Sequence, residues 1–261
     1  MARRRKIRWD RVALVFLPLL FLILLICTQC RHKEPPQESS SIAEVSAESS
    51  AADTNSNAVP AINEIDEFVV VIDPGHGGDD AGTTDGDSRY EKDDNLRIAL
   101  AVRDALLAHP HVKVILTRET DVFITLQDRC AIANQANADV FVSLHRNSAT
   151  EGNGIEIWVN NQDNSSDKRL AGYIMELLKD VGISKDRGIR SGYRTTNDGD
   201  NYYVNYYTEM PSCLIEMGFL TSDTDNQYFD ERLDSYAEAI ATGIVEYGTD
   251  LELYDAEAST E

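Results

Sequence analysis

The fold is decided by residues 68–82, FVVVIDPGHGGDDAG. The first five residues are apolar and four of them are β-branched, a pattern typical of a short strand that is covered on both faces in a parallel sheet. Pro74 cannot donate to a strand ladder and the glycines permit positive φ, so a tight turn should follow the strand. This turn would hold His76 at the C-terminal edge of the strand, where open α/β sheets bind their ligands.

A second apolar run ends in the same way. Residues 138–145, ADVFVSLH, end at His145, and polar residues follow it. A single His in a glycine-rich turn is most simply a polar turn residue, but two of the five His in this chain stand at the ends of predicted buried strands. Glu91 begins a helical pattern shortly after the first turn. Two imidazoles and one carboxylate form a three-ligand zinc site that leaves a fourth position for water.

The rest of the body alternates between helical and strand patterns. We expect helices at 95–107, 125–137, 170–178 and 233–247. We expect strands at 112–117, 154–159 and 212–215. This alternation is typical of βαβ units. The sequence therefore predicts an α/β fold, a single domain with a mainly parallel sheet flanked by helices on both faces.

Five sequence blocks resemble, in this order, the zinc-dependent N-acetylmuramoyl-L-alanine amidases of bacterial cell walls (amidase type 3). The blocks are IDPGHGG (72–78), EKD (91–93), LTR (116–118), SLHRN (143–147) and LIEMGFL (214–220). The resemblance covers roughly residues 68–247 and implies a similar α/β domain. It also implies that His76, Glu91 and His145 bind Zn²⁺ and that Glu216 is the catalytic carboxylate. The implied reaction is hydrolysis of the amide between N-acetylmuramic acid and L-alanine in peptidoglycan.

Glu216 follows the apolar run 212–215 as the two His follow theirs. A carboxylate in such a place is costly unless it reaches solvent, a metal or a partner. In the role that the resemblance implies, it would take a proton from water and deliver it to the leaving nitrogen. Arg146 stands where the family commonly has Ala, and it could reach a carboxylate of the stem peptide. No substrate-binding residue is otherwise identified.

Further side chains carry weaker signals. Four tyrosines could line a sugar or peptide groove or belong to a strand; they are Tyr202, Tyr203, Tyr206 and Tyr207. We interpret Arg118 and Asp121 as structural residues rather than substrate contacts. Cys130 and Cys213 are expected to be buried free thiols, since the sequence gives no sign that they meet.

The ends of the chain differ from the body. The whole protein has 261 residues and a net charge of -21, but residues 1–33 hold eight of the 24 Lys and Arg. The acidic remainder should repel nucleic acid. The apolar run 12–27 follows the basic cluster, so we expect a membrane anchor with the body outside the cytoplasm, or a secreted protein if this segment is a cleaved signal. We further expect a disordered linker at 34–67, the catalytic domain at 68–249 and an acidic tail at 250–261.

Two other functions share part of these features. A non-catalytic peptidoglycan-binding protein could use the same groove, but it would be indicated by loss of a ligand or of Glu216, and all four residues are present. A zinc peptidase for another substrate would share the site chemistry. The sequence does not indicate an oligomeric state.

Overall fold

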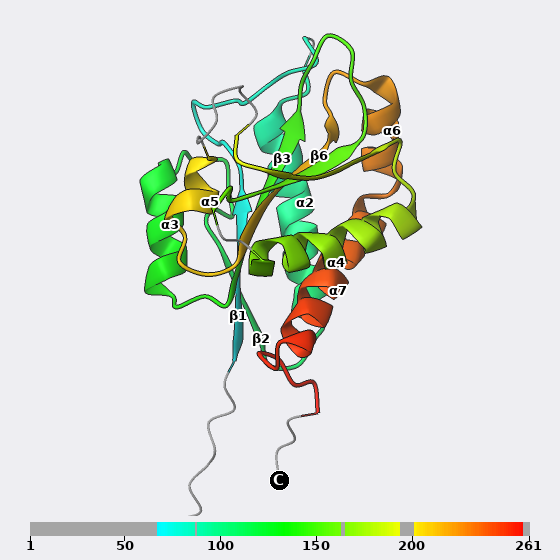
Figure 1. The fold of residues 1–261 in the computed structure, drawn as a ribbon. Coiled ribbons are helices and arrows are strands. Elements are labelled where there is room, and N and C mark those ends of the chain that lie inside the picture. Colours follow the sequence, from blue (N-terminus) through cyan, green and yellow to red (C-terminus); the bar gives the residue numbers. More distant parts are fainter. Residues whose placement is uncertain (1–66, 87, 163–164, 194–200, 258–261) are drawn as a thin grey trace, which may run out of the picture. The chain divides into compact units, whose positions relative to one another are not determined.

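A six-stranded sheet forms the centre of the part of the protein that the computed structural model describes, which is residues 67–86, 88–162, 165–193 and 201–257 (Figure 1). The strands lie in the order β2-β1-β3-β6-β4-β5. Their bounds are Phe68–Pro74 (β1), Val112–Leu116 (β2), Val140–Asn147 (β3), Ile155–Val159 (β4), Asp186–Ser191 (β5) and Ser212–Phe219 (β6). Four strands, β2, β1, β3 and β6, are parallel, whereas β4 runs antiparallel to β6 and parallel to β5.

Helices cover both faces of this sheet (Figure 1). Their bounds are Glu91–Leu106 (α2), Leu126–Gln135 (α3), Ser165–Val181 (α4), Tyr203–Tyr207 (α5), Asp223–Glu231 (α6) and Leu233–Asp250 (α7). On one face α2 and α4 pack against α7, and the larger apolar core lies between them and the sheet. On the other face α3 and α5 lie over a smaller apolar cluster that includes Val71, Phe141 and Trp158. The predicted α/β fold with a mainly parallel sheet is confirmed.

Side-chain caps fix where two of the helices begin. Thr125 accepts a hydrogen bond from the backbone N–H of Asp128 and so caps α3, and Ser222 caps α6 through the N–H of Asp225. Such caps satisfy backbone donors that have no partner within the helix. After α7 the chain returns to the start of β1, where Tyr254 is buried against the ring of Phe68. The predicted boundary between a domain at 68–249 and a tail at 250–261 stays a prediction.

Several elements differ from the sequence expectation. The edge strand β5 and the short helices α5 and α6 were not predicted, because β5 is mostly polar and exposed, α5 has only five residues and α6 is mostly polar. Strand β6 also continues to Phe219, so Glu216 lies inside a strand instead of following one. The extension pairs with β3, with His145 opposite Glu216 and Asn147 opposite Phe219, and the Phe219 N–H also donates to the buried carboxylate of Asp225 from α6.

The predicted membrane-anchored location is wrong, because no helix of the described residues is long and apolar enough to cross a bilayer. A spanning helix takes roughly 20 apolar residues. The run 12–27 has sixteen, with Pro18 among them, and it lies outside the described residues, as does 34–66 of the expected linker. We therefore retain neither the membrane location nor the membrane as a partner.

Both cysteines of the described body are buried free thiols, as expected. Cys130 lies in α3 and Cys213 in β6. Burial raises the pKa of Cys130 to about 11, with the nearby charge of Asp73 adding to the shift. The thiol is therefore protonated at neutral pH and packs as a small apolar side chain.

Candidate active site

Two buried arginines hold the turn that follows β1. Arg118 donates hydrogen bonds to the carbonyl oxygens of Pro74 and Gly75, at 3.0 and 2.8 Å. Arg129 donates to the carbonyls of Pro74 and His76, at 2.7 and 2.8 Å. His76 has a backbone φ of 60°, a value that is unfavourable for any residue other than glycine. The two guanidinium groups therefore fix the strained backbone that positions the His76 ring. This confirms the structural interpretation of Arg118.

Two glycines make room for the side chains that meet beyond this turn. A Cβ atom on Gly75 would lie 2.2 Å from Cε1 of His145. A Cβ atom on Gly82 would lie 2.6 Å from Oε2 of Glu91 and 2.7 Å from Cδ2 of His76, and its φ is +66°. Both positions require glycine because no other residue leaves space for the three side chains.

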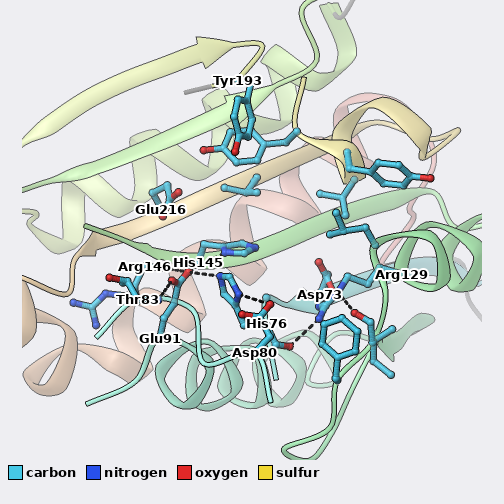
Figure 2. Close-up of a pocket in the computed structure, with 18 of the residues that line it drawn as sticks. Asp73, His76, Asp80, Thr83, Glu91, Arg129, His145, Arg146, Tyr193 and Glu216 are labelled. Atoms are coloured by element: carbon cyan, nitrogen blue, oxygen red, sulfur yellow. Dashed lines mark hydrogen bonds and ion pairs between the residues drawn. The ribbon is translucent and has the colours of Figure 1, made fainter. Parts of the chain in front are cut away.

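His76, Glu91 and His145 converge at the C-terminal edge of β1 and β3 (Figure 2). Oε1 of Glu91 lies 3.2 Å from Nε2 of His76 and 2.9 Å from Nδ1 of His145. One possible ligand atom from each residue lies within 4.8 Å of the others. The sequence prediction that these three residues meet is therefore realised in the fold. The set of two imidazoles and one carboxylate fits a tetrahedral zinc ion with one open position.

The charges of these groups depend on one another. Burial lowers the pKa of His76, but hydrogen bonds to Glu91 and Asp80 outweigh it and raise the pKa from 6.5 to about 9. Burial raises the pKa of Glu91, but the hydrogen bonds from His145 and His76 prevail and hold it well below its ordinary value of 4.5. Each of the two groups thus favours the charged form of the other. A metal that binds there must displace a proton from His76.

Asp80 supports the ring of His76 from the other side. Its Oδ2 lies 2.9 Å from Nδ1 of His76, and its Oδ1 accepts the backbone N–H of Gly82. A carboxylate on the second ring nitrogen is the usual way in which a metal-binding His is oriented. Sequence analysis missed Asp80, although an acid four residues after the His in a glycine-rich turn was a usable signal.

Glu91 is fixed by its helix and by two backbone donors. It is the first residue of α2, where the helix dipole favours a negative charge. Oε2 accepts the N–H of Thr83 at 2.9 Å, and Oε1 accepts the N–H of Arg146 at 3.2 Å. Glu91 is therefore held from the glycine-rich loop and from β3 at the same time.

Arg146 borders the pocket described below, but its side chain is buried in the fold, so the expectation that it contacts a stem-peptide carboxylate is wrong. Its side chain is 0% exposed and forms a buried ion pair with Asp94. Nη2 donates to Oδ1 of Asn226 at 2.6 Å, and the guanidinium lies 4.3 Å from the centre of the Phe229 ring. Asp94 also pairs with two more arginines, and we call this group the Asp94 cluster: Asp94, Arg89, Arg97 and Arg146.

Glu216 lies beside His145 on the same face of the sheet. The two residues are cross-strand partners in the β3–β6 pairing, so their side chains project in the same direction (Figure 2). Glu216 is 5% exposed and lines the same pocket as His76, Glu91 and His145. The sheet therefore places a fourth predicted residue next to the other three, although a strand interior and not a strand end positions it.

The pocket over these residues has a volume of about 740 Å³. Apolar and aromatic side chains form part of its wall, among them Phe123, Leu126, Tyr193, Tyr202 and Tyr203. The tyrosine group expected at a groove or in a strand lies in and beside α5, and Tyr202 and Tyr203 line the pocket. Tyr206 and Tyr207 are exposed and pack on each other.

A buried hydrogen-bond network lies under the pocket, and the sequence analysis did not find it. Asp73, which is 1% exposed, accepts hydrogen bonds from Thr117, Ser143 and Arg129 at 2.6 to 2.7 Å. These donors come from three different elements, so the network ties the ends of β1, β2 and β3 to α3. The acid between the strand and Pro74 was the available sequence signal.

Comparisons with known proteins identify the family of this chain. The family model described as N-acetylmuramoyl-L-alanine amidase (Amidase_3) matches residues 70–246. The uncharacterized protein YqiI of Bacillus subtilis is 35% identical over 191 residues, which cover 72% of this chain and 88% of YqiI. The amidase LytC of the same organism is 35% identical over 183 residues, covering 68% of this chain but 35% of LytC.

A solved structure shares both sequence and fold. The crystal structure of an N-acetylmuramoyl-L-alanine amidase from Clostridium difficile 630 is 37% identical, with a TM-score of 0.64. The match covers 70% of this chain and 97% of that one. The chain therefore belongs to the Amidase_3 family and is an amide hydrolase of the N-acetylmuramoyl-L-alanine amidase class.

Proposed function

We propose that this protein is a zinc-dependent amidase that hydrolyses the bond between N-acetylmuramic acid and L-alanine in peptidoglycan. In this proposal His76, Glu91 and His145 hold the zinc ion. Their donor atoms suit zinc in type and spacing, and Asp80 orients one of the two rings. When bound, zinc supplies a Lewis acid that lowers the pKa of a coordinated water and polarises a carbonyl group.

Glu216 is proposed as the residue that moves the proton. A carboxylate that faces the zinc site can accept a proton from the attacking water and pass it to the departing nitrogen. This transfer is needed because an amine leaves only after it is protonated. The placement of Glu216 opposite His145 on the same face of the sheet is the observation that carries the proposal.

The pocket supports the proposed substrate class. Its volume of about 740 Å³ is within the range of roughly 300–1,000 Å³ that is typical of small-molecule binding sites. The aromatic wall formed by Tyr202 and Tyr203 provides flat apolar surfaces on which a sugar ring can stack. A muramoyl peptide therefore matches the pocket in size and in surface.

Replacement of Glu216 by Gln tests the catalytic role. The amide keeps the volume of the side chain but cannot take a proton at neutral pH, so the rate should fall by roughly 10²- to 10⁴-fold while zinc content is unchanged. The measurement is the release of L-alanine amino groups from a muramoyl peptide at equal zinc occupancy. A rate equal to that of wild type would remove Glu216 from the mechanism.

Replacement of His76 by Ala tests the metal site. It removes one of three proposed ligands, so zinc measured by atomic absorption after dialysis should fall sharply. His109→Ala is the matched control, because His109 lies in the turn after α2 and does not line the pocket, so this variant should keep the wild-type zinc content. Full zinc occupancy in His76→Ala would show that the ion binds elsewhere.

A further inference from the structure

We infer that Arg187 and Arg190 form a subsite for a carboxylate of the stem peptide, the part of the substrate that departs from the amide. The inference rests on the proposed function and assigns a contact that the buried Arg146 cannot make. Both residues lie on the edge strand β5. Together with the buried carboxylate of Glu156 they form what we call the Glu156 cluster: Glu156, Arg187 and Arg190.

The Glu156 cluster lies on the catalytic face of the sheet. Glu156 of β4 is the cross-strand partner of Glu216, which in turn is the partner of His145. Trp158, the next residue of β4 on that face, pairs with Arg190. Paired residues of neighbouring strands project to the same side. A row of side chains thus runs from the zinc site across β6 and β4 to the two arginines.

One carboxylate oxygen of Glu156 contacts the guanidinium groups of both arginines. Its Oε2 lies 2.8 Å from Nε of Arg187 and 3.1 Å from Nε of Arg190. Its Oε1 is occupied by the side-chain donors of Asn147 and Trp158. The one negative charge of Glu156 is shared by two positive charges, so the cluster keeps a net charge of +1. The terminal Nη atoms, which form the fork that grips a carboxylate, have no protein acceptor among the described residues.

Aromatic rings fix the orientation of these guanidinium groups. Arg187 lies 4.9 Å from the centre of the Phe219 ring, and Arg190 lies 5.8 Å from that of Trp158. Their side chains are 25% and 44% exposed, so each remains open to solvent on one side. Stacking of this kind reduces the entropy that an arginine loses when it binds an anion. The pair is therefore prepared for a ligand and not only for Glu156.

A second pocket of about 230 Å³ lies in front of the Glu156 cluster. It is lined by both arginines, Glu156 and Phe219, and Ser148 lines both this pocket and the catalytic one. Two strand spacings separate Glu216 from β5, which is roughly 10 Å. An extended peptide covers that distance with about three residues. The glycan is neutral whereas the stem peptide carries carboxylates, so the arginines select the peptide side of the substrate.

The test compares two synthetic muramoyl peptides that differ only in whether the peptide carboxylates are free or are carboxamides. Wild type should show a kcat/KM about tenfold higher for the free carboxylates, the size of one charge-assisted hydrogen bond at a half-exposed site. Arg190→Gln should reduce that ratio severalfold through a higher KM, because only Arg187 remains in the subsite. Arg190→Lys keeps the charge and should restore part of it. Arg169→Gln, which alters an equally exposed arginine on α4, should keep the wild-type ratio.

The outcome separates the subsite from the proposed function. No preference in wild type, or an unchanged ratio in Arg190→Gln, would overturn the subsite. If wild type released no product from either substrate, the proposed function would fail, and calorimetry with the same peptides would still test the subsite. Tighter binding of the carboxylate form by wild type, lost in Arg190→Gln, would support it, and equal binding of both forms would overturn it.

Discussion

The Asp94 cluster and the Glu156 cluster use the same residue types and do different things. In each, a carboxylate less than 5% exposed is shared by more than one arginine. Arg146 of the Asp94 cluster is fully buried under Phe229 and Asn226 of α6. Arg190 of the Glu156 cluster is 44% exposed at the edge of the sheet. The comparison shows that cover by a neighbouring helix decides whether an arginine is buried in the fold or stays open to solvent.

The difference also bears on the zinc site. The backbone N–H of Arg146 donates to Glu91, and its side chain pairs with Asp94 one turn further along α2. The Asp94 cluster therefore ties the first turn of α2 to β3, next to two proposed zinc ligands. Among the described residues, the Glu156 cluster has no ion pair with a proposed ligand, and it is joined to the site through the row of side chains across β6 and β4 and through Ser148, which lines both pockets.

Removing Arg146 should have the largest effect. Arg146→Ala leaves the carboxylate of Asp94 buried without its closest partner, and the free energy of unfolding should fall by roughly 3–5 kcal/mol. Urea unfolding followed by circular dichroism measures it. Arg190→Ala is the control and should cost less than about 1 kcal/mol because its ion pair is half exposed. Similar losses in the two variants would break the distinction between the clusters.

The sequence expectation for Arg146, that it could reach a carboxylate of the stem peptide, failed for a physical reason. Arg146 follows His145 directly, and a residue in that place could equally face a substrate. What buries it is α6, about 80 residues further on, and α6 was not predicted because its pattern is short and polar. Contacts between distant segments of this kind cannot be read from local periodicity.

The convergence of the other residues could be predicted because it depends on strand ends. Apolar runs placed His76 and His145 at the same edge of a parallel sheet, and the helix that starts at Glu91 lies beside them. The antiparallel strand β4 and the edge strand β5 could not be placed in the same way, since β5 is polar and exposed. The Glu156 cluster was therefore not visible before the strands were paired.

A smaller effect is expected for Glu156→Gln. The amide keeps the shape but loses the charge that both arginines share, so stability should fall by roughly 1–3 kcal/mol. The variant should unfold at a lower urea midpoint than wild type but at a higher one than Arg146→Ala. Glu151→Gln, at an exposed bend before β4, is the matched control and should leave the midpoint unchanged. A loss as large as that of Arg146→Ala would mean that the Glu156 cluster is structural in the same sense as the Asp94 cluster.

The smallest effect is expected for Asp230, an exposed residue that pairs with two arginines of the Asp94 cluster. Asp230 accepts hydrogen bonds from Arg89 and Arg97 and is 48% exposed. Burial raises the pKa of Asp230, but these hydrogen bonds outweigh it and hold the pKa below its ordinary value of 3.8. A carboxylate whose pKa is lowered by folding stabilises the protein above the unfolded value, and this contribution is lost as the pH falls through the folded value.

Asp230→Asn should therefore be destabilised at pH 7 by about 0.5–1 kcal/mol, the range of an exposed ion pair, and should match wild type near pH 2. Thermal unfolding at both pH values measures the difference. Asp180→Asn, at an exposed position of α4, is the control and should show no such dependence. A difference that stayed constant down to pH 2 would mean that the ion pairs of Asp230 do not stabilise the fold. Asp230 would then contribute no more to stability than an isolated surface charge. The stabilisation by the Asp94 cluster would come from the pair of Arg146 and Asp94 alone.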